Sequence, residues 1–175
     1  MDVSAAPVGA YDGGMYLDAL SFLEDERDTF RPYEALLDLT DDQLERPVEA
    51  AHGWSGRDLM GHVTVWQEYA LAAAKELAVG ESSATKQQAD RDWDAAPDAG
   101  ERINEEHLAQ FRDLPLAELR DRFSTVAGEL RGYLTVVPES RWIKHADHQN
   151  WFFAETIEHY EDHAGDLAAI LDAAR

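Results

Sequence analysis

The sequence predicts an all-α fold, a four-helix bundle in which one connection is a long crossover. Apolar residues recur at helical spacing in four long segments of the 175-residue chain, which has the length of one domain. Residues 81–99 are polar and separate the second of these segments from the third, as a crossover requires. No internal repeat or low-complexity stretch occurs in the sequence. We therefore expect one bundle domain over residues 14–175, preceded by a flexible arm over residues 1–13.

The first helical pattern covers residues 15–39. Pro32 lies inside this pattern and is expected to kink the helix or to split it near Arg31, because proline has no N–H for the helical hydrogen bond. The connector that follows is expected to hold a short turn of its own. Thr40 is its expected N-cap, because Gln43 stands three residues later in the capping-box position.

The second helix has the clearest start. Ser55 is the expected N-cap, Asp58 stands at the capping-box position, and Gly80 is the expected stop. Further helices are expected over residues 100–112, from Pro115 to Pro138, and from Trp151 to the end of the chain. The stretch "ESRWIKHADHQNWF", residues 139–152, is expected to be irregular.

The composition excludes several classes of function. The chain has no cysteine, so any metal must be held by imidazole, carboxylate or water. The net charge is −21, from 15 basic and 36 acidic residues, which argues against binding to nucleic acid or to an anionic membrane surface. No apolar run is long enough for a membrane span, and the N-terminus lacks the features of a signal peptide. A cytoplasmic location is the default expectation.

Two histidines, His159 and His163, are four residues apart in "EHYEDH" and therefore lie one turn apart on one face of the last helix. A zincin protease needs glutamate directly after the first histidine, where this chain has Tyr160. The candidate for a third ligand is His62, on the apolar face of the second helix beside Trp66. Metal sites in bundles are built from inward-facing side chains of different helices. Taken alone, a histidine on such a face is more often a hydrogen-bonded core residue.

Other side chains are weaker candidates. Asp58 and Glu155 each stand four residues before a predicted ligand, where a carboxylate can accept the free imidazole N–H. Their ordinary interpretations are a helix-start residue and a solvated charge. Four aromatic residues are candidates for a pocket wall, although as a group they are more often core: Trp66, Tyr69, Trp151 and Tyr160. The remaining histidines are expected to be structural: His52, His107, His145 and His148. Either His148 or Asp147 could still reach the mouth of the site, because their segment leads directly into the last helix.

Three stretches carry a resemblance to a known family. "GWSGRDLMGHVTVW" resembles the Trp-Ser-x-x-Asp-Leu-x-x-His motif of the DinB-like (YfiT-like) metalloenzyme superfamily, and "EHYEDH" is similar to the His-x-x-x-His of its last helix. "ERINEEHLAQFRDLPLAELRDRF" resembles the branch that includes the DfsB and ClbS proteins and the mycothiol-dependent maleylpyruvate isomerases. The resemblance covers nearly the whole chain after residue 14. It implies a DinB/YfiT-like bundle in which His62, His159 and His163 bind one metal ion.

The resemblance also implies a function. It is that of a metal-dependent thiol S-transferase or isomerase, which uses a small thiol such as mycothiol or bacillithiol on an electrophilic small molecule. Two alternatives stay open, a metal-dependent hydrolase or resistance protein of ClbS type, and a non-catalytic ligand-binding bundle. A homodimer is a further implication of the resemblance. On ligand type alone, three imidazoles and water suit zinc, nickel or iron equally.

Overall fold

The computed structural model describes residues 11–12 and 15–175 of the chain. Most of the arm expected over residues 1–13 lies outside the described residues. The first described elements are two short strands that pair antiparallel, β1 (Tyr11–Asp12) and β2 (Met15–Tyr16). In the described part of the chain, the other regular elements are helices, and none has the length and apolar character that crossing a membrane demands.

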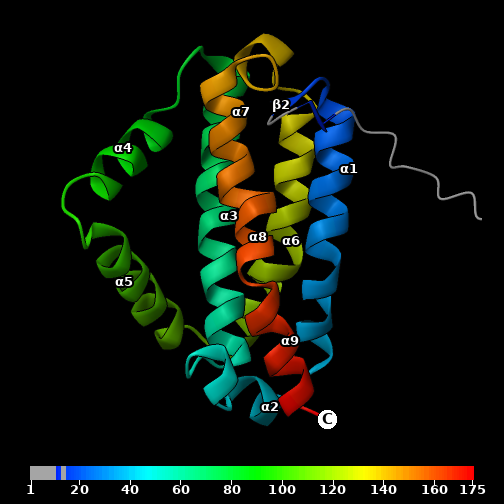
Figure 1. Cartoon of the computed structure of the whole chain (residues 1–175), viewed down its shortest axis with the longest axis vertical. Coiled ribbons are helices and arrows are strands. Elements are labelled where there is room, and N and C mark those ends of the chain that lie inside the picture. The colour runs from blue at the N-terminus through cyan, green and yellow to red at the C-terminus, as the bar shows by residue number, and fades with distance from the viewer. Residues whose placement is uncertain (1–10, 13–14) are drawn as a thin grey trace, which may run out of the picture.

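Four helical rods lie side by side and form the bundle, which confirms the predicted fold class (Figure 1). The first rod is α1, which continues into a 3-10 segment, and the fourth is divided into three helices. The rods are α1 (Ala19–Phe30) with Arg31–Asp38, α3 (Gly56–Val79), α6 (Leu116–Leu134), and the C-terminal rod of α7 (Ala146–Phe153), α8 (His159–Asp162) and α9 (Ala164–Ala173). The long helix α3 packs against both α6 and the crossover, so it connects the bundle to the rest of the molecule.

The predicted break in the first rod and the two predicted capping boxes are confirmed. The rod changes from α-helix to 3-10 helix at Arg31, directly before Pro32. The short helix α2 (Asp41–Glu45) begins with the expected capping box of Thr40 and Gln43. A single 3-10 turn, Glu49–Ala51, then leads to the equally expected capping box that starts α3, and Gly80 ends that helix.

Residues 81–99, the expected crossover, contain the helix α4 (Ala84–Trp93), which their polar composition did not indicate. The helix expected over residues 100–112 is confirmed as α5 (Ala99–Asp113). Both helices lie to one side of the bundle, and together they are called the crossover below (Figure 1). The side chain of Ser83 caps α4 by accepting a hydrogen bond from the N–H of Lys86. At the other end, α5 closes tightly on α3, because a Cβ at Gly61 would lie only 2.8 Å from Phe111. One end of the crossover is thus fixed to the bundle by close packing.

The C-terminal rod differs from its prediction in two ways. Residues 139–152 are only partly irregular, since α7 begins at Ala146. Its N-cap is His145, a residue type that is rarely used as a cap, so no helix start could be recognised there from sequence. The expected single helix from Trp151 onward is interrupted by a π-helical segment, Ala154–Glu158, and again at His163. Both interruptions border the histidine pair.

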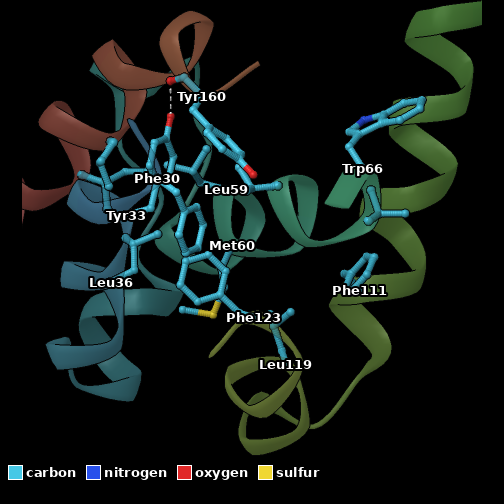
Figure 2. Packing of buried hydrophobic residues seen from close by; sticks show 14 of the residues in the cluster. Phe30, Tyr33, Leu36, Leu59, Met60, Trp66, Phe111, Leu119, Phe123 and Tyr160 are labelled. Carbon is cyan, nitrogen blue, oxygen red and sulfur yellow. Dashed lines mark hydrogen bonds between the residues drawn. The ribbon is translucent and has the colours of Figure 1, made fainter. Parts of the chain in front are cut away.

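The core of the bundle is rich in packed aromatic rings. The ring of Phe30 lies 5.5 Å from that of Phe123 and 5.4 Å from that of Tyr160, measured between centroids. The hydroxyl of Tyr33 donates a hydrogen bond to the backbone oxygen of Tyr160, which attaches the first rod to the C-terminal rod (Figure 2). Trp66 lies apart from these rings, on the side of α3 that faces the crossover (Figure 2).

Candidate metal centre

Three histidines from distant parts of the chain converge inside the bundle. His62 lies on α3, His159 is the first residue of α8, and His163 joins α8 to α9. Each offers one ring nitrogen to a group in which all three atoms lie within 4.8 Å of one another. The ring centroid of His62 is 4.7 Å from each of the others, which are 4.9 Å apart. The fold brings these three candidates together, and their role as metal ligands stays a prediction.

The backbone around the histidine pair departs from a regular α-helix. The π-helical segment Ala154–Glu158 ends directly before His159. A π turn contains an extra residue, so it rotates the helix faces that follow it relative to those that precede it. The N–H of His163 still bonds to the backbone oxygen of His159, at 3.3 Å. The two imidazoles therefore keep their one-turn spacing while the π segment sets the direction in which they face.

Two side chains that support the histidines were missed by the sequence reasoning. The indole of Trp54 stacks on His163 with centroids 5.4 Å apart, and it meets His62 edge-on at 4.9 Å. Oδ2 of Asp166 accepts a hydrogen bond from Nδ1 of His163 at 2.8 Å, which leaves the lone pair on Nε2. The available signals were the Trp-Ser motif for Trp54 and the three-residue helical spacing from His163 for Asp166.

The electrostatics of the site favour neutral imidazoles. Burial lowers the pKa of His62 to about 2 and the pKa of His159 to about 3, and neighbouring imidazoles add to both shifts. Both rings are therefore uncharged near pH 7, as metal ligation requires. Among the described residues, Nδ1 of His62 and Nε2 of His159 are buried without a hydrogen-bond partner. Unpartnered buried nitrogens are rare because they cost free energy, so this donor set fits a divalent metal ion.

Asp58 supports the start of α3 and makes no hydrogen bond with His62. Its Oδ2 accepts a hydrogen bond from the N–H of Ser55 at 3.0 Å, and its Oδ1 accepts one from Nε of Arg112 at 2.7 Å. Burial acts to raise the pKa of Asp58, but the hydrogen bonds from Arg112 and Ser55 outweigh it and lower the pKa. The ordinary interpretation, a helix-start residue, is the one that these contacts support.

A cavity of about 640 Å³ adjoins the histidines and is lined by His159, Trp66 and Trp151. Glu155, on the π segment, lines it as well. Burial and the nearby charge of Asp90 raise the pKa of Glu155 to about 8, so its carboxyl is largely protonated at neutral pH. In the described part of the chain, no hydrogen bond joins Glu155 to a histidine of the group. Glu155 thus contributes its carboxyl group to the cavity wall. Its spacing from His159 had suggested a hydrogen bond to the imidazole, which the structure does not contain among the described residues.

The other two aromatic candidates lie elsewhere. Tyr69 lines a separate, smaller cavity of about 250 Å³, together with Trp66 and His107. Tyr160 is a core residue, because it is only 1% exposed and its hydroxyl bonds to Glu26. Tyr160 directly follows His159 on the helix, and the side chains of consecutive helical residues do not point in the same direction. The pocket prediction is therefore wrong for Tyr160.

A second group of possible ligands consists of His145, Asp147 and His148. Each member already has a protein partner. Nδ1 of His145 accepts a hydrogen bond from the N–H of His148, and Nδ1 of His148 lies 2.6 Å from the backbone oxygen of Arg141. Asp147 pairs with Lys86 at 3.0 Å and lines the cavity. These contacts fit the structural role expected of the two histidines.

Comparison with known proteins gives one match. A family model described as the mycothiol maleylpyruvate isomerase N-terminal domain matches residues 27–168. This range includes all three converging histidines and most of the bundle. Neither a curated protein nor a solved structure matches the chain significantly.

Proposed function

The chain belongs to the mycothiol maleylpyruvate isomerase N-terminal domain family, within the DinB-like superfamily, and on this premise we propose that it is a metal-dependent enzyme. In this proposal it uses a small thiol, of the mycothiol or bacillithiol kind, on an electrophilic small molecule. The reaction is a transfer of the thiol to the electrophile or an isomerisation that the thiol assists. His62, His159 and His163 are the proposed metal ligands.

The observation that supports the metal most directly is the pair of buried ring nitrogens without partners, Nδ1 of His62 and Nε2 of His159. Unless a ligand binds these two nitrogens, the protein has two unsatisfied polar atoms in its interior. Zinc, nickel and iron all accept three imidazoles with a further position open to solvent or substrate. A divalent ion held there would polarise a carbonyl group or favour the thiolate form of a bound thiol.

The protein's own side chains have separate proposed roles. Asp166 holds His163 in one tautomer through the 2.8 Å contact with Nδ1. The indoles of Trp66 and Trp151 form apolar parts of the cavity wall and limit the access of water to the site. Glu155 holds a proton at its carboxyl group near neutral pH and is placed to give it to a substrate atom in the cavity. We therefore propose Glu155 as the general acid.

Elemental analysis of the purified protein tests this proposal first. We expect about one equivalent of a divalent transition metal per chain, and less than about a tenth of that in His62→Ala, because two imidazoles alone bind metal weakly. His107→Ala is the matched control, since His107 is also buried with an unpartnered Nδ1 but lies outside the histidine group. Folded wild-type protein that takes up no metal would contradict the proposal.

The thiol is tested with the metal-loaded protein and a panel of electrophiles. We expect mycothiol or bacillithiol to be consumed in step with the electrophile, at a rate at least about 100-fold above that of His62→Ala. Turnover without any thiol would instead identify a metal-dependent hydrolase. Binding of the electrophile with no turnover under either condition would identify a non-catalytic bundle.

A further inference from the structure

The cavity beside the histidines has an acidic wall. Among the described residues that line it, five carry carboxyl groups: Asp90, Asp94, Asp147, Glu155 and Asp162. The single ammonium group in this described lining is that of Lys86. A divalent ion held by the three imidazoles would add two positive charges, which still leaves carboxylates in excess even when Glu155 is protonated. The cavity therefore presents a negative potential to whatever enters it.

Lys86 is not available to bind an anion. Its Nζ lies 2.7 Å from Oδ2 of Asp90 and 3.0 Å from Oδ2 of Asp147, and its side chain is nearly buried. Protein sites that recognise carboxylate or phosphate present arginine or lysine donors that are free to bond with the ligand. In this lining the lysine donors already point at the protein's own acids. A dicarboxylate would have to displace one of these pairs.

The same wall carries three indole rings, those of Trp66, Trp93 and Trp151. Trp93 is held in place although it is 48% exposed, because its ring meets Trp66 edge-on at 5.8 Å. Gly100 permits this position, since a Cβ there would lie 2.8 Å from the ring of Trp93. The face of an indole attracts organic cations, and tryptophan does so more strongly than other aromatic residues. Exposed Trp93 and the next residue, Asp94, which pairs with no lysine or arginine among the described residues, are thus combined in the cavity wall.

We propose that this cavity selects a positively charged substrate, a protonated amine carried on an aromatic or apolar body, over a carboxylate of the same size. The proposal rests on the proposed function for the assignment of the cavity as the substrate site. The ammonium group lies toward Asp94, the residue that follows α4, and the body of the molecule lies against the indoles. The histidine side of the cavity is left for the reacting atoms.

Three probes of the same size and different charge test the selection: benzylamine, benzyl alcohol and benzoate. Their affinities for the full chain are measured at pH 7 by tryptophan fluorescence and by calorimetry, with and without zinc. We expect benzylamine to bind at least about tenfold more tightly than benzoate, with benzyl alcohol between them, and the preference to weaken at high salt. Equal or tighter binding of benzoate, or no binding of any probe, would overturn the proposal.

A matched pair of substitutions at the C-terminal end of α4 locates the effect. Asp94→Asn, directly after the helix, removes a carboxylate of the cavity wall. Asp92→Asn, two residues earlier, removes a carboxylate that lines the other cavity. Both change the net charge equally. We expect benzylamine affinity to fall by about fivefold in Asp94→Asn and by less than about twofold in Asp92→Asn. Equal losses in the two variants would mean that only the overall charge of the protein matters and would refute the proposed site.

The metal measurements keep the two proposals separate. If the protein takes up no metal but prefers benzylamine with the Asp94 dependence, then the proposed enzyme function fails and the charge selection stands. If it takes up metal and consumes thiol but binds benzoate at least as tightly as benzylamine, then the charge selection alone fails.

Discussion

The bundle contains an arginine that pairs with an acid, and the crossover contains a lysine that pairs with two acids, but the two networks differ in their exposure to water. In the bundle, Glu26 is fully buried, and its two oxygens accept hydrogen bonds from Arg131 at 2.7 Å and from Tyr160 at 3.0 Å. In the crossover, Lys86 pairs with two acids that stay in contact with water, since the side chain of Asp147 is 70% exposed. The first network is part of the core, and the second forms the edge of a cavity.

This difference separates the part of the protein that fixes the positions of the histidines from the part that supplies the charged groups of the cavity. The hydroxyl of Tyr160 also accepts a hydrogen bond from Gln67, and its backbone oxygen accepts one from Tyr33. Tyr160 lies between His159 and His163 in sequence, so the buried network fixes the part of the C-terminal rod that carries them. The crossover contributes none of the three histidines, but it supplies Lys86 and much of the charge in the cavity wall. We therefore expect substitutions in the bundle to change stability, and substitutions in the crossover to change selectivity.

Glu26→Ala should have the largest effect on stability. It leaves the guanidinium of Arg131 and the hydroxyl of Tyr160 without their buried acceptor, which is expected to lower the free energy of unfolding by about 3 kcal/mol. Urea unfolding at pH 7 measures the change. Glu24→Ala, on the exposed side of the same helix, is the control and should change the value by less than about 0.5 kcal/mol. A loss of similar size in both variants would contradict the assignment of the bundle network to the core.

Glu155 lies on the bundle and lines the cavity, so Glu155→Gln tests the boundary between the two regions. Its effect on stability should be intermediate. In the folded protein the pKa of Glu155 is raised from 4.5 to about 8, so between these values the folded chain keeps a proton that the unfolded chain has released. Stability should therefore fall as the pH rises through this window, and the loss should be complete above the folded pKa.

Glutamine carries no titrating proton, so Glu155→Gln should be more stable than the wild type by about 1–2 kcal/mol at about pH 9 and equal to it below about pH 4.5. Urea unfolding across this pH range measures the difference. Glu158→Gln, at an exposed position of the same segment, is the control and should change the free energy of unfolding by less than about 0.5 kcal/mol. If Glu155→Gln leaves the pH dependence of the wild type unchanged, then the carboxyl is not held protonated in the cavity.

Lys86→Met should have the smallest effect on stability. Its partners Asp90 and Asp147 remain solvated after the substitution, so the free energy of unfolding should fall by only about 1 kcal/mol. Thermal or urea unfolding measures this, with the exposed Lys144→Met as a control that should show almost no change. A loss as large as that of Glu26→Ala would remove the distinction between the bundle and the crossover.

Local sequence signals determined much of the fold. The capping boxes at Thr40 and Ser55, the break before Pro32 and the apolar periodicity each depend on residues within a few positions of one another. These interactions form in the same way whatever the rest of the chain does, so they can be predicted from sequence. Signals were weak where the structure uses unusual local chemistry, as at the histidine cap of α7 and the π segment before His159.

The candidate site also has features that local sequence signals predict and features that they do not. The sequence by itself determined that His159 and His163 share one helix face and that His62 faces the core, because helical geometry relates residues one turn apart. Only the tertiary structure decided that the three rings meet, that Trp54 and Asp166 support them, and that Tyr160 turns inward. It also placed α4 so that its acids line a cavity beside His159. These features depend on how helices far apart in sequence pack against each other, and helical periodicity contains no information about that packing.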